Sequence, residues 1–227
     1  MPRLKPVAVW QRVRHHPRVI VMQPVLEILA ADDFALWPVG EHESYGYLVL
    51  DGKLTPADVG TAVMRIADCN GFEPDEGHEP CPAGPLGTFL YGLLTKPDLL
   101  APGGFRVTDT ATNTVFVEPG CCNGLETWRD WLEVLDGTGY ADFGHDPSSA
   151  AERVGDTVRL TLDAHGTDGR PVIELPVDQV RRLVVGAQQD LQNFLSLAGT
   201  WAEEVLPAYA AAVTAALRRA VDLAPTQ

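Results

Sequence analysis

Apolar residues recur along the chain at two spacings, which predict strands and helices. Segments rich in β-branched and aromatic residues, typical of strands, cover residues 18–29 and 45–52. We expect Pro24 to end the first strand, because proline has no N–H to donate to a sheet. Further strand-like segments are paired across short polar turns, and each pair predicts a β-hairpin: 105–110 with 113–119, and 157–163 with 170–176.

Apolar residues at helical spacing follow Thr55. This threonine fits the N-cap, Pro56 the first helical position and Asp58 the third, close to a capping box. Gly71 is expected to end this helix. The apolar segment that starts at Leu86 fits either a helix or a strand.

A second helix is predicted after the stretch CCNG. Asn123 suits its N-cap, and Glu126 follows at capping-box spacing. Its apolar residues fall on one face: Leu125, Trp128, Trp131, Leu132 and Leu135. The two tryptophans are therefore expected to anchor a core.

The long segments 72–85 and 137–156 are rich in proline, glycine and charged residues, which predicts loops. After Pro176, apolar residues at helical spacing continue toward the C-terminus. Gly199 and Pro207 interrupt this pattern, so we expect two helices or one kinked helix.

Strands that come in hairpins, with helices not regularly alternating between them, predict an α+β fold. We expect a mostly antiparallel sheet covered by helices, with a C-terminal helical pair. The best division of the chain gives an α+β domain over residues 1–150, and a hairpin with the C-terminal helices over 151–227. The second part is expected to pack on the first as one globular unit.

The chain has 227 residues, is 45% hydrophobic and carries a net charge of -14. This charge repels phosphate and argues against nucleic acid as a partner. It favours a basic protein partner, although a solvated acidic surface gives the same composition. No segment approaches the ~20 apolar residues of a membrane span, and no signal-peptide pattern is present. With four cysteines, too few for a disulfide scaffold, we expect a cytoplasmic protein with reduced thiols and no membrane association.

Four residues could together bind zinc: Cys69, His78, Cys81 and Cys121, with Cys122 as the alternative to Cys121. Thiolates and imidazoles are the usual zinc ligands, and His78 and Cys81 stand close enough to clamp an ion from one loop. The alternative is that Cys69 is a small buried residue and His78 is simply solvated. A zinc ion here would more naturally be structural than catalytic.

Cys122 is the candidate nucleophile, because a helix N-terminus lowers the pKa of a thiol. His145 or His78 could act as the base that such a thiol requires. Asp142, His145 and Asp146 cluster in a glycine-rich loop and could hold a cation or form an acid–base pair. The alternatives are two small cysteines that fill a tight turn, and an Asp/His group that serves only the turn at Pro147.

The run CCNGLETWRDW, followed by GHDP and LPVDQVRRL, resembles a group of uncharacterised proteins from high-GC bacteria. The resemblance covers about the second half of the chain. It implies a soluble bacterial protein and assigns no activity and no catalytic residue.

Two functions follow as hypotheses. One is an acidic, immunity- or regulator-like protein that binds a basic protein partner. The other is a metal- or thiol-dependent hydrolase that uses the Cys/His cluster. A structural zinc ion in a binding protein would combine parts of both.

Overall fold

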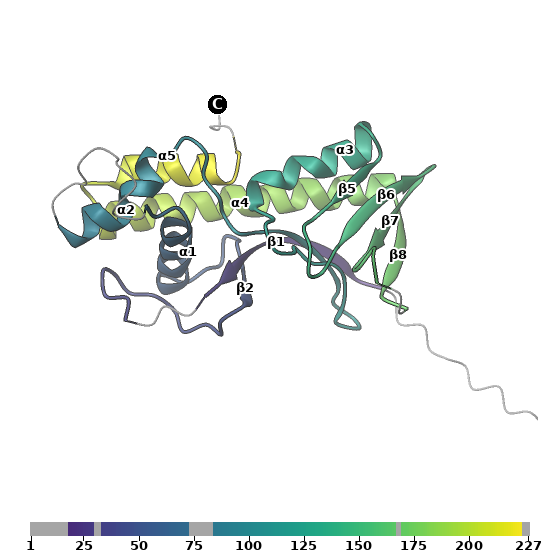
Figure 1. The fold of residues 1–227 in the computed structure, drawn as a ribbon, viewed down its shortest axis with the longest axis horizontal. Helices are drawn as coiled ribbons and strands as arrows, with labels where there is room; N and C mark the ends of the chain where they lie inside the picture. Colours follow the sequence, from purple (N-terminus) through teal and green to yellow (C-terminus); the bar gives the residue numbers. More distant parts are fainter. Residues whose placement is uncertain (1–17, 30–32, 73–83, 167–168, 224–227) are drawn as a thin grey trace, which may run out of the picture.

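The computed structural model describes residues 18–29, 33–72, 84–166 and 169–223. Within these residues the chain forms two antiparallel four-stranded sheets (Figure 1). The first sheet has the order β2-β1-β3-β4, with strands β1 (Ile20–Ile28), β2 (Gly46–Val49), β3 (Gly103–Asp109) and β4 (Thr114–Val117). The second has the order β5-β6-β7-β8, with strands β5 (Tyr140–Asp142), β6 (Ala150–Val154), β7 (Thr157–Thr161) and β8 (Val172–Pro176).

Strand β1 passes through Pro24, so the prediction that this proline ends the strand is wrong. Pro24 pairs with Phe105 of β3, and its carbonyl accepts a hydrogen bond from the N–H of Leu50, just beyond β2. In an extended strand, the N–H and C=O of one residue point to the same side. The position of the missing N–H therefore faces the side where the short strand β2 ends. Its absence removes no hydrogen bond between β1 and β3.

The helices are α1 (Pro56–Cys69), α2 (Pro85–Thr95), the 3-10 helix η1 (Leu125–Arg129), α3 (Asp130–Asp136), α4 (Val177–Val205) and α5 (Ala210–Ala220). The predicted capping box of α1 is confirmed. The Thr55 hydroxyl accepts from the N–H of Asp58 at 3.2 Å, and the Asp58 carboxylate accepts from the N–H of Thr55 at 3.1 Å. The ambiguous segment from Leu86 is the helix α2.

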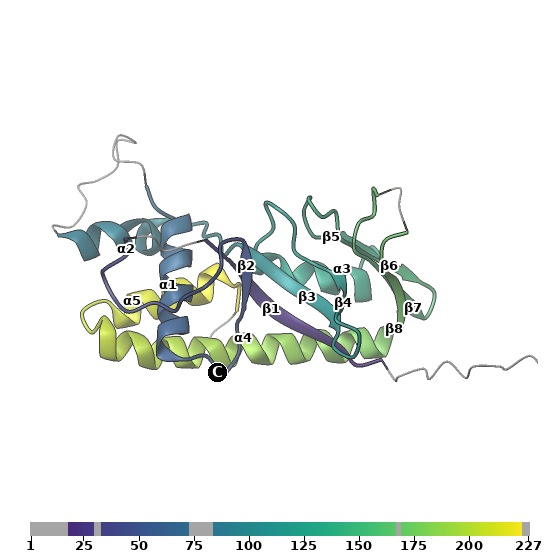
Figure 2. The ribbon, with the colours of Figure 1, turned by 90° about the horizontal axis from the view of Figure 1, so that it is seen from below.

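Helix α4 extends along both sheets and contacts elements of each (Figures 1 and 2). It continues through Gly199, so the expected interruption there is wrong, and α4 ends just before Pro207. A Cβ at Gly199 would lie 3.8 Å from the side chain of Thr214 in α5, at ordinary contact distance. Gly199 therefore lies inside α4, at the place where α5 packs against it. The predicted C-terminal helical pair is confirmed.

The segment 137–156, predicted to be a loop, contains the strands β5 and β6. Both are short, and β5 pairs with β6 through Ala141 and Ala151. Residue 150, where the sequence suggests a division, is the first residue of β6, and β6 pairs with strands on both sides.

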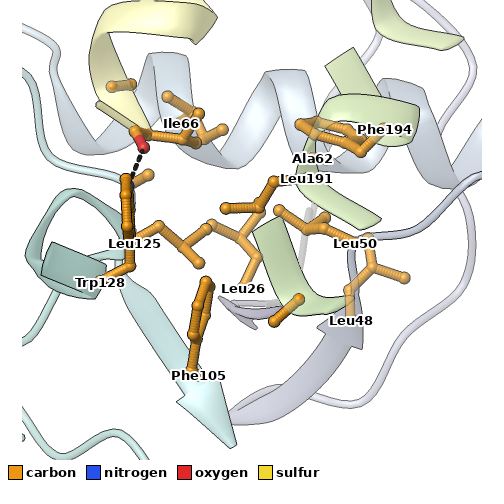
Figure 3. Packing of buried hydrophobic residues seen from close by; sticks show 14 of the residues in the cluster. Leu26, Leu48, Leu50, Ala62, Ile66, Phe105, Leu125, Trp128, Leu191 and Phe194 are labelled. Atoms are coloured by element: carbon orange, nitrogen blue, oxygen red, sulfur yellow. Dashed lines mark hydrogen bonds between the residues drawn. The ribbon is translucent and has the colours of Figure 1, made fainter. Parts of the chain in front are cut away.

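The buried apolar residues form a continuous core that draws on both sheets and on α1 to α5. Figure 3 shows its central part, where Leu26 of β1 and Phe105 of β3 face Leu191 of α4. Trp128 is 5% exposed, and its indole N–H donates to the carbonyl of Val221, at the end of α5, at 3.1 Å. Trp128 and Trp131 are therefore core anchors, as predicted.

The arrangement confirms an α+β fold built from antiparallel hairpins and covered by helices. In the described part of the chain, no helix combines the length and the apolar character that a membrane crossing requires.

Candidate functional site

The loop 118–124, between β4 and η1, carries both adjacent cysteines. It is fixed to the first sheet by side chains: the hydroxyl of Tyr47 donates to the carbonyl of Pro119 at 2.7 Å, and the amide of Asn123 donates to the carbonyl of Gly103 at 2.8 Å. Burial, with repulsion from nearby glutamates, raises the pKa of Tyr47 to about 12. The phenol therefore stays a hydrogen-bond donor through the neutral range.

The predicted helix cap at Asn123 is wrong. Gly124 is the N-cap of η1, and no side chain caps this helix. The side-chain oxygen of Asn123 instead accepts from the hydroxyl of Thr127 at 3.2 Å, while its amide reaches back to β3. Asn123 thus fastens the loop to the sheet, a role that its spacing in the sequence does not reveal.

A second segment, residues 143–149, lies against this loop through backbone hydrogen bonds. The N–H of Gly120 donates to the carbonyl of Phe143 at 2.7 Å, and the N–H of Cys121 donates to the carbonyl of His145 at 2.6 Å. Cys121 and His145 form an isolated antiparallel bridge. A Cβ at Gly144 would lie 2.7 Å from the carbonyl of Cys121, and Gly144 has a φ of 95°, so a glycine is required for this close approach.

The bridge brings together three side chains of the kinds that can bind a metal ion. One donor atom each of Cys121, Cys122 and His145 lies within 4.8 Å of the others, and all three residues are exposed. The two Sγ atoms are 3.5 Å apart. Nδ1 of His145 lies 3.3 Å from a carboxylate oxygen of Asp146. The structure thus unites the predicted catalytic candidates Cys122, His145 and Asp146 with Cys121.

Beside this cluster lies a cavity of about 800 Å³, which we call the acidic cavity. Among the described residues, its titratable lining consists of three carboxylates, Asp130 and Glu133 of α3 and Asp142 of β5, together with His145 and His165, and includes no lysine or arginine. In the part of the chain that the structure describes, none of these carboxylates belongs to an ion pair. Burial raises the pKa of Asp130, and repulsion by Asp142 and Glu133 raises it further.

Helix α3 forms one wall of the acidic cavity. Its buried face holds Trp131, whose ring stacks on Phe143 with a centroid distance of 4.6 Å and an interplanar angle of 19°. Asp130 and Glu133, three residues apart, line the cavity from the same helix. This stacking pair therefore positions both the carboxylates and the segment that carries His145.

A nucleophilic role for Cys121 is not favoured by its surroundings. A hydrogen bond with Cys122 raises the pKa of the Cys121 thiol, and repulsion by the Cys122 thiolate adds to this shift. A catalytic thiol requires the opposite shift, toward the thiolate.

Cys69, another residue of the predicted zinc site, does not join this cluster. Cys69 is half-buried at the end of α1, burial raises its pKa, and it lines a different cavity with Lys96, Glu126 and Arg219. His78 and Cys81 lie outside the described residues.

Asp130, Glu133 and His165 line the acidic cavity but were not predicted as site residues. A signal for the first two exists: they stand at helical spacing opposite the apolar face of Trp131 and Leu135. His165 lies in a turn between β7 and β8, and no local pattern relates it to the cysteines.

Compared with known proteins, the chain matches no protein-family model, no curated protein and no solved structure.

Proposed function

We propose that this chain is an acidic binding protein whose acidic cavity receives basic side chains of a protein partner. The observation that carries this proposal is a group of three carboxylates, Asp130, Glu133 and Asp142, in one cavity. Within the described ranges of the chain they have no ion-pair partner, and no lysine or arginine lines the cavity. Carboxylates at close range repel one another unless a cation lies between them. A cation supplied by a partner would remove this repulsion.

Acidic residues near the acidic cavity are neutralised by arginines, whereas no arginine of the described residues neutralises the carboxylates of the cavity. Asp136, one turn further along α3, is neutralised by both terminal nitrogens of Arg181, at 2.7 and 2.8 Å. Arg159 likewise pairs with Glu174 on the second sheet, at 2.9 Å. The arginines therefore neutralise acids elsewhere and leave the acidic cavity charged.

The acidic cavity also suits the shape of a basic side chain. Tyr140 lies in its lining and is 49% exposed, so it offers an aromatic ring to the long apolar stem or to the charge of an arginine. Arginine is enriched among the residues that dominate protein interfaces. The net charge of -14 would speed the approach of a basic partner.

Fluorescence anisotropy with a labelled arginine-rich peptide, in the presence of a chelator, tests the proposal. The variant D130N/E133Q/D142N removes the charges of the acidic cavity. A matched variant, D33N/D156N/E204Q, also removes three carboxylates, each exposed and outside the cavity. Three ion pairs at least partly open to solvent, each contributing up to about 1 kcal/mol, predict an affinity about 10- to 100-fold weaker for the cavity variant.

We expect the matched variant to bind within about threefold of the wild type, and binding to weaken as salt is added. Equal weakening of both variants would show that net charge, rather than the acidic cavity, attracts the peptide. Binding that does not change with salt would contradict the electrostatic basis of the proposal.

A hydrolase is the second candidate, because Cys122 and His145 lie close together and line the same cavity. It predicts that the wild type hydrolyses a simple activated ester and that C122S and H145A do not. Equal rates in all three proteins would remove this candidate.

A further inference from the structure

We propose that Cys121, Cys122 and His145 form a binding site for a soft divalent metal ion of the zinc class, with one coordination position open to the acidic cavity. The proposal goes beyond the binding of a basic partner. It also differs from the zinc site expected from the sequence, which combines Cys121 with Cys69, His78 and Cys81.

The donor atoms already stand near the separations that a tetrahedral ion requires. With zinc–sulfur bonds of about 2.3 Å, two thiolates on one ion lie about 3.8 Å apart. The Sγ atoms of Cys121 and Cys122 are 3.5 Å apart, and the donor nitrogen of His145 completes a group within 4.8 Å. Small rotations of exposed side chains are enough to bring all three onto one ion.

The backbone holds the two contributing segments in register. Cys121 and His145 are joined by a hydrogen bond of 2.6 Å in one direction and one of 3.4 Å in the other. Cys122 has a φ of 65°, in the left-handed region that a non-glycine residue seldom adopts. This conformation accompanies the close approach of the Cys122 sulfur to that of Cys121, where a regular strand would place neighbouring side chains on opposite faces.

Asp146 supplies the outer partner that metal-bound histidines commonly have. Its carboxylate lies 3.3 Å from Nδ1 of His145, which leaves Nε2 as the nitrogen for the ion. Such a carboxylate fixes the ring and makes its free nitrogen a better ligand. Asp146 is therefore a positioning residue in this site.

The chemistry of the donors selects the class of metal. Two thiolates and an imidazole favour zinc and related soft ions over calcium or magnesium, which prefer oxygen ligands. The three carboxylates of the acidic cavity make the neighbourhood attractive to a cation. A water molecule from the cavity can occupy the open position, as in zinc sites that are not closed by four protein ligands.

The test is a titration of the full chain, reduced and freed of metal, with Zn²⁺ in competition with a chromophoric chelator. Cobalt(II), in a parallel titration, reports thiolate ligands by its charge-transfer absorption. We expect about one ion per chain, with tight binding lost in C121S, C122S and H145N. For D146N we expect an affinity weakened about 10- to 100-fold.

C69S and H42N serve as matched controls, one cysteine and one histidine outside both the cluster and the acidic cavity, and both should bind zinc like the wild type. Because the three ligands are exposed, the variants should keep the wild-type circular dichroism, so that lost binding is not lost folding. The proposal is overturned if the wild type binds no zinc at equimolar concentration. It is also overturned if C122S or H145N binds normally, or if binding disappears in C69S, H78N or C81S instead. Because the peptide assay contains a chelator, it measures peptide binding without metal. A negative result in one assay therefore leaves the other proposal standing.

Discussion

Ser149 links the two sheets through its side-chain hydroxyl, and its replacement by alanine tests how strongly they are joined. The residue is fully buried, at 0% exposure. Its hydroxyl accepts from the N–H of Glu118, just after β4, at 3.1 Å and donates to the carbonyl of Leu162, just after β7, at 2.9 Å. S149A removes the oxygen and leaves a backbone donor and a backbone acceptor without this partner.

Each hydrogen bond lost in this way lowers stability by about 0.5–1.5 kcal/mol, and more when the group left behind is shielded from water. We therefore expect S149A to lower the free energy of unfolding by about 2 kcal/mol. In a chain of this size that corresponds to a fall in Tm of about 4–8 °C. Urea unfolding followed by tryptophan fluorescence measures the loss, with the denaturant slope unchanged if the folded state is otherwise preserved.

The neighbouring variant S148A is the control, because the Ser148 hydroxyl makes no hydrogen bond within the described residues. It should stay within about 0.5 kcal/mol of the wild type. A loss of less than about 0.5 kcal/mol in S149A would refute the reasoning, because it would mean that water or a local shift satisfies both backbone groups.

Three further variants test other parts of the fold. T55A removes half of the capping box with Asp58 and should lower stability by about 1 kcal/mol in urea unfolding; an unchanged midpoint would contradict the role of the cap. G92A would place a Cβ 1.9 Å from the carbonyl oxygen of Asn70, so it should lower stability by more than about 1 kcal/mol, whereas a neutral result would mean that α1 and α2 separate freely. D130N should stabilise the protein at neutral pH, because the raised pKa of Asp130 means that its charged form disfavours the folded state. This gain in stability should shrink as pH falls through the raised pKa and vanish below the ordinary aspartate pKa of about 3.9. Thermal unfolding at several pH values measures it, and a gain that is the same at every pH would exclude the charge as its cause.

The elements that the sequence predicts well are those whose signals are local. The capping box at Thr55 uses atoms three residues apart, and the hairpin of β7 and β8 has its turn between two apolar segments. Strands β5 and β6 escaped prediction because they are short and flanked by glycine, aspartate and proline. Their extended conformation depends on pairing, of β5 with β6 and of β6 with β7, rather than on their own residues.

The sequence indicated which residues of the candidate site are reactive, but not which of them lie close together in space. Cys122, His145 and Asp146 stood out as reactive residues, and the structure brings them together. Their proximity arises from one backbone bridge between Cys121 and His145, and periodicity cannot show such a pairing. The acidic cavity was missed because Asp142 was expected in a loop. Its strand, β5, is set by pairing with β6, and the local sequence does not show that pairing.

The position of helix α4 in the chain determines when the core can close during synthesis. It follows β8 directly, with Pro176 as both the last residue of β8 and the N-cap of the helix. Ribosomes make both sheets before they make the helix whose buried face contacts them. Until α4 emerges, the apolar residues that it covers, such as Leu26, remain open to water and to other chains. We therefore expect a stage of synthesis at which this apolar surface is open to chaperones, and we expect it to end when α4 packs on the sheets.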